Sequence, residues 1–224
     1  MAGELFEPLQ AAGVDKPLAL RLARYGALVL EANRSFNLTG AKTAADLVPH
    51  LLDSLSVAAF VGTSLCDVGS GAGLPAIPVA LATGVPITLI EATRKKAAFL
   101  QRVLAAFDLT GEVVAERAEI AAHRPDLREA FAAGTARAVA AAPTVAELLL
   151  PFVEIGGLAI LQRGTMDERE RTALTDACLM LGAEIEEERR LDEQRRIVLV
   201  RKRTATPARF PRRTGIPEKR PLCT

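Results

Sequence analysis

The chain has 224 residues, half of them hydrophobic, which suits one domain with attachments or at most two small domains. No apolar run reaches the ~18 residues of a membrane span, and no charged-then-apolar leader opens the chain. The three cysteines (Cys66, Cys178, Cys223) lie far apart, which argues against a disulfide framework. We therefore expect a cytoplasmic protein with no membrane segment.

The charge is unevenly distributed, although the net charge is only +1. Residues 1–194 hold 18 basic and 26 acidic side chains, whereas residues 195–224 hold 10 basic and one acidic. A basic tail on an acidic body suggests an anionic partner, with nucleic acid as the first candidate.

The first 60 residues are expected to form a helical extension packed on the main domain. Apolar side chains recur at three- and four-residue spacing from Leu18 to Ala32, after Asp15, which can cap a helix. This helix should end near residues 33–35, and Thr43 or Asp46 begins another one.

Two polar stretches in this extension stand out. Asn37 opens a polar loop between helices, and His50 and Asp53 lie one turn apart on one helix face. The pair is either a histidine held by a carboxylate for packing or a functional pair, and the sequence leaves both readings open.

Residues 65–75 have the order strand, glycine turn, helix, with the pattern Asp67-x-Gly69-x-Gly71-x-Gly73. A dinucleotide fingerprint needs Gly-x-Gly-x-x-Gly, and here Leu74 takes the position of its third glycine. The pattern instead resembles motif I of class I S-adenosylmethionine (AdoMet) methyltransferases. The alternative is a glycine turn without a ligand. Asp67 either braces this loop or contacts the ammonium group of the ligand.

Strands and helices then alternate. We expect strands at 86–90, 112–116, 135–140 and 157–161, helices at 97–107 and 172–181, and an antiparallel pair at 184–189 and 196–200. This alternation predicts an α/β fold with a doubly wound, mostly parallel, Rossmann-like sheet over residues 61–203. Ligands of such sheets bind at the carboxyl ends of the central strands.

Candidate site residues follow these strands. Glu91 ends the second strand about 20 residues past the glycine turn, where an acidic residue accepts hydrogen bonds from ribose hydroxyls. Arg94, Lys95 and Lys96 open the next helix against its dipole, which suggests phosphate contacts or only a solvated helix end. Residues 117–119 flank an adenine or form an ordinary polar loop. Arg137 lies in a small, apolar strand and needs a carboxylate partner from the ligand or the protein.

The last residues, 204–224, form a basic tail rich in proline. Pro207, Pro211, Pro217 and Pro221 are expected to prevent a helix, so we predict an extended strap whose Arg212 and Arg213 contact RNA phosphates. A disordered, solubilising tail is the alternative.

Several motifs in one order carry a resemblance to a known family. They are Asn37-Leu38-Thr39, His50-x-x-Asp53-Ser54, the loop 67–75, Glu91-Ala92-Thr93-Arg94-Lys95-Lys96, Arg117-Ala118-Glu119, Arg137-Ala138 and the tail from Phe210 to Leu222. Together they resemble the bacterial RsmG (GidB) family, the small-subunit ribosomal RNA guanine-N7 methyltransferases, over nearly the whole chain. The departures are mild: Ser70, Ala72 and Ala76 replace commoner residues, and Glu91 stands where aspartate is usual.

The resemblance implies a class I AdoMet-dependent methyltransferase that modifies a guanine of 16S rRNA and releases S-adenosyl-L-homocysteine (AdoHcy). It implies no metal, and we expect a monomer that acts on 16S rRNA or on the assembling small subunit. The residues expected to bind the cofactor are Asp67, Gly69, Gly71, Gly73, Leu74, Glu91, Ala92, Thr93, Ala118, Glu119 and Arg137, and Arg137 is also expected near the transfer site. The residues expected to bind RNA are Asn37, His50, Asp53, Arg94, Lys95, Lys96, Arg212 and Arg213.

The expected reaction needs no general acid or base, because guanine N7 carries a lone pair and no proton. The Asn-Pro-Pro-Tyr motif of amino-group methyltransferases is absent, and Cys66 lies inside the first strand. Two other functions remain possible: an AdoMet-fold ribosome-assembly factor without catalysis, and a small-molecule methyltransferase. The intact glycine loop with Glu91 speaks against the first, and the basic tail against the second.

Overall fold

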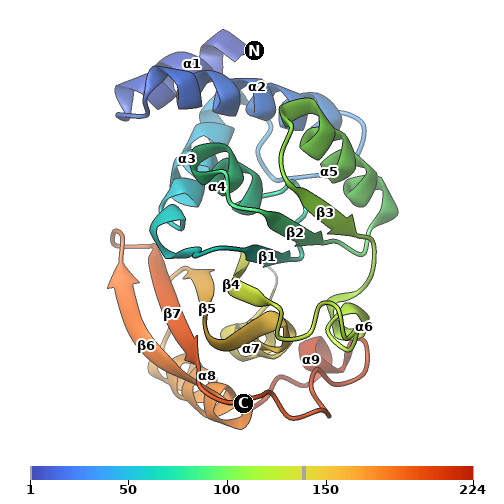
Figure 1. The fold of residues 1–224 in the computed structure, drawn as a ribbon. Helices are drawn as coiled ribbons and strands as arrows, with labels where there is room; N and C mark the ends of the chain where they lie inside the picture. The colour runs from blue at the N-terminus through green and yellow to red at the C-terminus, as the bar shows by residue number, and fades with distance from the viewer. Residues whose placement is uncertain (1, 138–139, 224) are drawn as a thin grey trace.

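A seven-stranded sheet runs through the molecule in the order β3-β2-β1-β4-β5-β7-β6 (Figure 1). The computed structural model describes residues 2–137 and 140–223. Strands β3, β2, β1, β4 and β5 are parallel, and β7 pairs antiparallel with both β5 and β6. The strands are β1 Leu65–Val68, β2 Ile87–Ile90, β3 Gly111–Val114, β4 Phe131–Arg137, β5 Val153–Arg163, β6 Ala183–Arg190 and β7 Arg196–Lys202. The expected doubly wound, mostly parallel sheet is confirmed.

Both faces of the central part of the sheet are buried, because successive side chains of the inner strands enter different hydrophobic clusters, whereas the edge strands β3 and β6 are largely exposed. In β1, Leu65 belongs to one cluster and its neighbour Cys66 to the other. The first cluster includes α4 (Ala76–Thr83) and α5 (Arg94–Phe107), and the second includes α6 (Ala118–Ala121), α7 (Ala142–Leu149) and α8 (Glu168–Met180). The result is a three-layer arrangement with the carboxyl ends of the parallel strands at one edge (Figure 1).

Three N-terminal helices extend the first layer: α1 (Ala2–Ala11), α2 (Lys16–Asn33) and α3 (Ala44–Leu55), followed by a 3-10 turn at Ala58–Phe60. The Asp15 side chain caps α2, and Thr43 and Asp46 form a capping box at the start of α3. The buried Tyr25 hydroxyl donates to the Ala72 carbonyl oxygen at 2.7 Å. The helical extension therefore reaches the glycine loop directly.

The C-terminal segment, residues 204–223, is docked on the body and contains a short helix, so the expectation that its prolines prevent a helix is wrong. Phe210 and Leu222 are buried, and α9 (Ile216–Lys219) forms a short helical turn that begins with Pro217 near its first position. Proline at the first turn costs no hydrogen bond, which is why this proline-rich stretch still contains a helix. A second 3-10 turn, at Leu150–Phe152, precedes β5.

Some predicted boundaries also shift. β4 begins at Phe131 rather than Thr135, because pairing with β1 and β5 recruits the residues before the small, apolar stretch. Residues 138 and 139 of that expected strand lie outside the described residues. Within the described part of the chain, no helix is long and apolar enough to cross a membrane.

Candidate functional site: a nucleoside-sized cavity beside an arginine-lined cavity

The glycine loop between β1 and α4 has a backbone that only glycine adopts easily. Gly69, Gly71 and Gly73 have φ angles of 71°, 55° and 93°. A Cβ on Gly73 would lie 2.5 Å from Cγ1 of Ile77, so this glycine also allows α4 to pack closely. The glycines of the sequence pattern are therefore needed for the positive φ angles of this turn.

Glu91 connects this loop to the end of β2. Its Oε2 accepts a hydrogen bond from the Gly71 N–H at 3.0 Å, and its Oε1 accepts one from the Thr93 N–H at 2.7 Å. The residue is buried, with 6% of its surface exposed. Because a carboxylate has about four acceptor positions, Glu91 can brace both loops and still accept hydrogen bonds from a ligand.

A cavity of about 370 Å³ opens beside these residues. This is within the size range of small-molecule sites. Among the predicted cofactor-binding residues, six line it together: Gly69, Glu91, Ala92, Thr93, Ala118 and Glu119. Its far wall comes from Thr144 and Leu148 of α7 and Glu218 of α9, which the sequence analysis missed because nothing local in α7 or the tail marks them as neighbours of β2.

Asp67, at the end of β1, is the most unusual group nearby. Both of its carboxylate oxygens are buried and have no hydrogen-bond partner among the described residues. Burial raises the pKa of this carboxyl well above its usual range, and the nearby Ser70 hydroxyl and then the Arg137 charge offset only part of that shift. An orphaned, buried carboxylate needs a cationic or donor group to satisfy it. The donor set therefore fits AdoMet: Asp67 suits an ammonium, Glu91 suits ribose hydroxyls, and Ala118 and Glu119 border space for a base.

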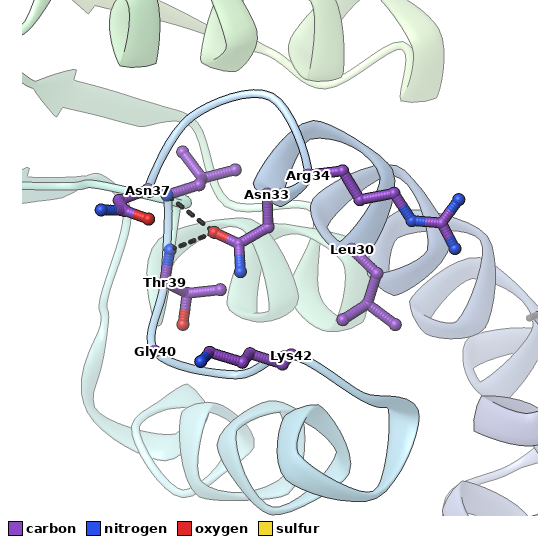
Figure 2. Close-up of a pocket in the computed structure, with 8 residues that line it drawn as sticks. Leu30, Asn33, Arg34, Asn37, Thr39, Gly40 and Lys42 are labelled. Carbon is purple, nitrogen blue, oxygen red and sulfur yellow. Dashed lines mark hydrogen bonds between the residues drawn. The ribbon is translucent and has the colours of Figure 1, made fainter.

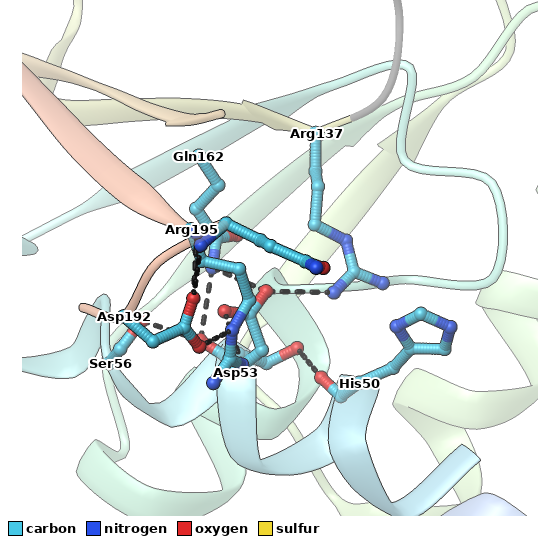
Figure 3. Close-up of polar contacts among 9 residues, drawn as sticks. His50, Asp53, Ser56, Arg137, Gln162, Asp192 and Arg195 are labelled. Atoms are coloured by element: carbon cyan, nitrogen blue, oxygen red, sulfur yellow. Dashed lines mark hydrogen bonds and ion pairs between the residues drawn. The ribbon is translucent and has the colours of Figure 1, made fainter. Parts of the chain in front are cut away.

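Arg137 ends β4 on the other side of β1, and its partner is Asp53 of α3 (Figure 3). The distance from Arg137 Nη1 to Asp53 Oδ2 is 3.4 Å. Arg195, from the turn between β6 and β7, approaches the other carboxylate oxygen at 3.2 Å. Gln162 of β5 donates to the Asp53 main-chain oxygen and to Oδ2, at 3.0 and 3.2 Å. Asp53 therefore binds two arginines rather than His50.

These residues surround a second cavity, of about 620 Å³, which we call the arginine cavity. It is lined by Thr39, Gly40, His50, Asp53, Arg137, Gln162, Arg163, Gly164, Thr165, Arg195 and Arg196. Arg163 pairs with Glu170 at 2.7 Å, and Arg196 pairs with Glu188 at 2.6 Å. Arg137 and Arg195 share Asp53, and Arg195 also pairs with Asp192 at 2.6 Å. Four ion-paired guanidinium groups therefore line one cavity.

His50 adds little charge to the arginine cavity at neutral pH. Partial burial lowers the pKa of its imidazole, and the nearby Arg137 lowers it further. Arg195 and Gln162 were missed by the sequence analysis, because they lie over 100 residues from Asp53 and only the sheet brings them together.

The loop that contains Asn37 is held from behind by a residue that the sequence analysis also missed. Oδ1 of Asn33 accepts hydrogen bonds from the N–H groups of Leu38 and Thr39 at 2.8 and 3.0 Å, and Nδ2 donates to Ala41 (Figure 2). Asn37 itself is exposed at the rim of a shallow cavity. The Leu38 carbonyl oxygen lies 3.9 Å from where a Cβ on Gly71 would stand. The loop therefore covers the outside of the glycine turn.

The basic residues expected to bind RNA separate into two groups. Arg94 and Lys95 are exposed on the first turn of α5, with Lys96 half-buried, and Arg213 is exposed. Arg212 is committed to the protein: its Nη2 lies 2.6 Å from Oε2 of Glu147, a carboxylate with no exposed surface. Its assignment as a phosphate contact is therefore corrected to a structural ion pair.

Two other kinds of chemistry find no support in the side chains. Cys66 is completely buried, and burial raises the pKa of its thiol, so it is no ready thiolate nucleophile. Over residues 2–137 and 140–223, no cluster of three or more His, Cys, Asp or Glu side chains could hold a metal ion.

Comparison with known proteins places this chain in a family. The family described as rRNA small subunit methyltransferase G matches residues 19–198. The ribosomal RNA small subunit methyltransferase G of Leuconostoc mesenteroides is 36% identical, over 98% of each chain, and that of Pelotomaculum thermopropionicum is 39% identical, over 88% of each. A solved structure of the 16S rRNA N2 methyltransferase RsmC of T. thermophilus, with AdoMet and guanosine, is 18% identical with a TM-score of 0.51, over 71% of this chain and 40% of that one. This last likeness shows the shared fold.

Proposed function

Because the chain belongs to the rRNA small subunit methyltransferase G family, we propose that it transfers the methyl group of AdoMet to N7 of a guanine in 16S rRNA. The products are N7-methylguanine in the RNA and AdoHcy. The family supports a small-subunit ribosomal RNA methyltransferase, and the choice of N7 rests on the resemblance carried by the sequence motifs. An rRNA substrate also favours a cytoplasmic location.

The observation that carries this proposal is the position of Arg137. It lies two residues beyond Thr135, the β4 residue that pairs with Asp67 of β1, and it lines the arginine cavity. Methyl transfer requires the donor and the acceptor to meet, and the pairing of β4 with β1 sets Arg137 next to the strand that leads into the glycine loop. The four arginines that line this cavity, Arg137, Arg163, Arg195 and Arg196, suit a polyanionic acceptor such as RNA, which also speaks against a small neutral substrate.

The side chains present fit an acceptor that loses no proton. AdoMet, when bound, supplies an electrophilic sulfonium methyl group, which the N7 lone pair attacks while the carbon–sulfur bond breaks. No general base is required, and His50 and Asp53 need not act as one. The work of the protein is positioning: Asp67 and Glu91 fix the cofactor, and Arg137 and Arg195 fix the nucleotide.

Transfer of labelled methyl groups from AdoMet to small ribosomal subunits, and separately to naked 16S rRNA, tests the proposal. The wild-type protein should label at least one of these substrates. Glu91→Ala should lose both AdoHcy affinity and transfer, because it removes the bond to Gly71 and the ribose acceptor. Arg137→Ala should keep AdoHcy affinity within about threefold and lose transfer about 100-fold or more, as misplaced reactants do. Labelling of neither RNA by the wild type contradicts the proposal.

A further inference from the structure

The C-terminal segment is anchored at several points around one region of the body. Arg212 pairs with the buried Glu147 of α7. Three residues further on, the Gly215 N–H donates to Oε1 of Glu119 at 2.8 Å. The Thr144 hydroxyl of α7 then donates to the Pro217 carbonyl oxygen at 3.0 Å. These contacts fix the turn before α9, and α9 itself, against α6 and α7.

Two of the three anchors belong to the cofactor cavity. Glu119 and Thr144 line it, and so does Glu218, the third residue of α9. Glu119 is itself buried, with 9% of its surface exposed. The cavity is therefore closed on this side by a segment that lies about 100 residues further along the chain than α6.

We propose that the turn at Gly215 and α9 form a wall of the cofactor site that holds the adenine end of the cofactor. This inference rests on the proposed function. Glu91 marks the ribose side of the cavity, so the base must extend toward α6, α7 and α9. The exocyclic amino group is the only hydrogen-bond donor on the base of a bound adenosine, and carboxylates only accept when ionised. Glu218, together with the free oxygen of Glu119, matches that donor.

The wall has a consequence for selectivity. A purine with a carbonyl oxygen in place of the amino group, as in S-inosylhomocysteine, turns an acceptor toward these carboxylates and leaves them unpaired. Sites built around a hydrogen-bond donor reject analogues that lack it. The segment therefore acts as a specificity element for adenine, besides closing the cavity.

Calorimetry with AdoHcy and with S-inosylhomocysteine tests this role. Glu218→Ala and Thr144→Val should each weaken AdoHcy binding about three- to tenfold, the usual effect of one hydrogen bond. Glu218→Ala should also narrow the preference for AdoHcy over the inosine analogue. Thr144→Ser keeps the hydroxyl and should bind as the wild type does, and Glu154→Ala, at an exposed site on β5, serves as the second control.

Hydrogen exchange of the full-length protein gives an independent measurement that needs no variant. The amides of Lys219 and Arg220 bond to Gly215 and Ile216, and AdoHcy should slow their exchange if α9 contacts the cofactor. The inference is overturned if AdoHcy leaves the exchange of these two amides unchanged and if Glu218→Ala and Thr144→Val bind AdoHcy within twofold of the wild-type affinity. The proposed function stands in that case. Failure of the wild type to bind AdoHcy at all refutes the proposed function, and the inference with it.

Discussion

At the scale of single residues, Asp67 shows how a binding site costs stability. A buried carboxylate without a partner favours its protonated form, and at neutral pH the fold carries the penalty of that burial. Asp67→Asn keeps the shape and removes the charge. We expect this variant to raise the melting temperature of the free protein by about 2–8 °C, the effect of roughly 1–2 kcal/mol, and to weaken AdoHcy binding at least tenfold.

Calorimetry and thermal melting of this variant beside Asp176→Asn, an exposed position, provide the comparison. A variant that melts lower than the wild type and binds AdoHcy equally well would show that Asp67 only braces the loop.

The same carboxylate predicts a pH dependence. Its pKa is higher in the folded protein than in the unfolded chain, so the fold binds the proton more tightly. Stability should therefore fall as pH rises from the ordinary carboxyl pKa through the raised one, because the unfolded chain ionises first. AdoHcy affinity should rise over the interval in which folded Asp67 ionises, since the ammonium binds the charged form. Both the melting temperature and the AdoHcy affinity should depend less on pH in Asp67→Asn than in the wild type. An equal pH dependence in the two proteins contradicts the role of Asp67 as the ammonium partner.

At the scale of elements, the C-terminal segment separates structural arginines from those available to RNA. Arg212→Ala leaves Glu147 buried with only the main-chain N–H of residue 212 as a partner, and breaking such pairs costs about 3–5 kcal/mol. The variant should melt about 6–20 °C lower. The triple variant of the exposed residues Arg213, Lys219 and Arg220 to alanine should melt within about 2 °C of the wild type.

RNA binding across a salt series should show the reverse pattern. Each phosphate contact contributes about 0.7–0.9 to the slope of log affinity against log salt, so the triple variant should have a slope shallower by about 2, with AdoHcy affinity unchanged as the control. An unaltered slope rejects a phosphate role for these three residues.

The sequence predicted those elements whose position depends on a local pattern of residues. The predictions around the glycine turn agree best with the structure. Asp15 caps the helix that it was expected to cap, and the helix expected to begin at Thr43 or Asp46 begins just after Thr43. The glycine spacing predicted the turn after β1, which Glu91 contacts. These features depend on neighbours in the chain or on the fixed geometry of a βα unit. The predicted β6–β7 pair is confirmed for the same reason.

The features that could not be predicted depend on contacts between distant segments. The pairing of Arg137 with Asp53 spans 84 residues, and that of Arg212 with Glu147 spans 65. No local sequence pattern distinguishes Arg212 from Arg213, because the carboxylate that pairs with Arg212, Glu147, lies on α7. Glu147 is buried on α7, beneath the C-terminal segment, and its pairing with Arg212 makes this arginine structural while Arg213 stays exposed.

At the scale of the whole molecule, the charge asymmetry of the sequence is partly cancelled by folding. The basic residues of β7 and those just after it face the acidic β6: Arg196 pairs with Glu188, Arg201 with Glu186, and Arg203 with Glu184. Exposed positive charge remains on the first turn of α5, at Arg94 and Lys95, and on the C-terminal segment, at Arg213, Lys219 and Arg220. We expect these exposed cations, together with the arginine cavity, to contact an RNA.

The measurement that tests the central claim most directly is mass mapping of small-subunit rRNA from a strain that lacks this protein, restored with the wild type or with Arg137→Ala. The account predicts that one guanine of 16S rRNA is unmethylated at N7 in the deletion strain. It regains the methyl group with the wild-type protein and stays unmodified with Arg137→Ala expressed at an equal level. An rRNA whose N7-methylguanine pattern is the same with and without the protein would contradict the account.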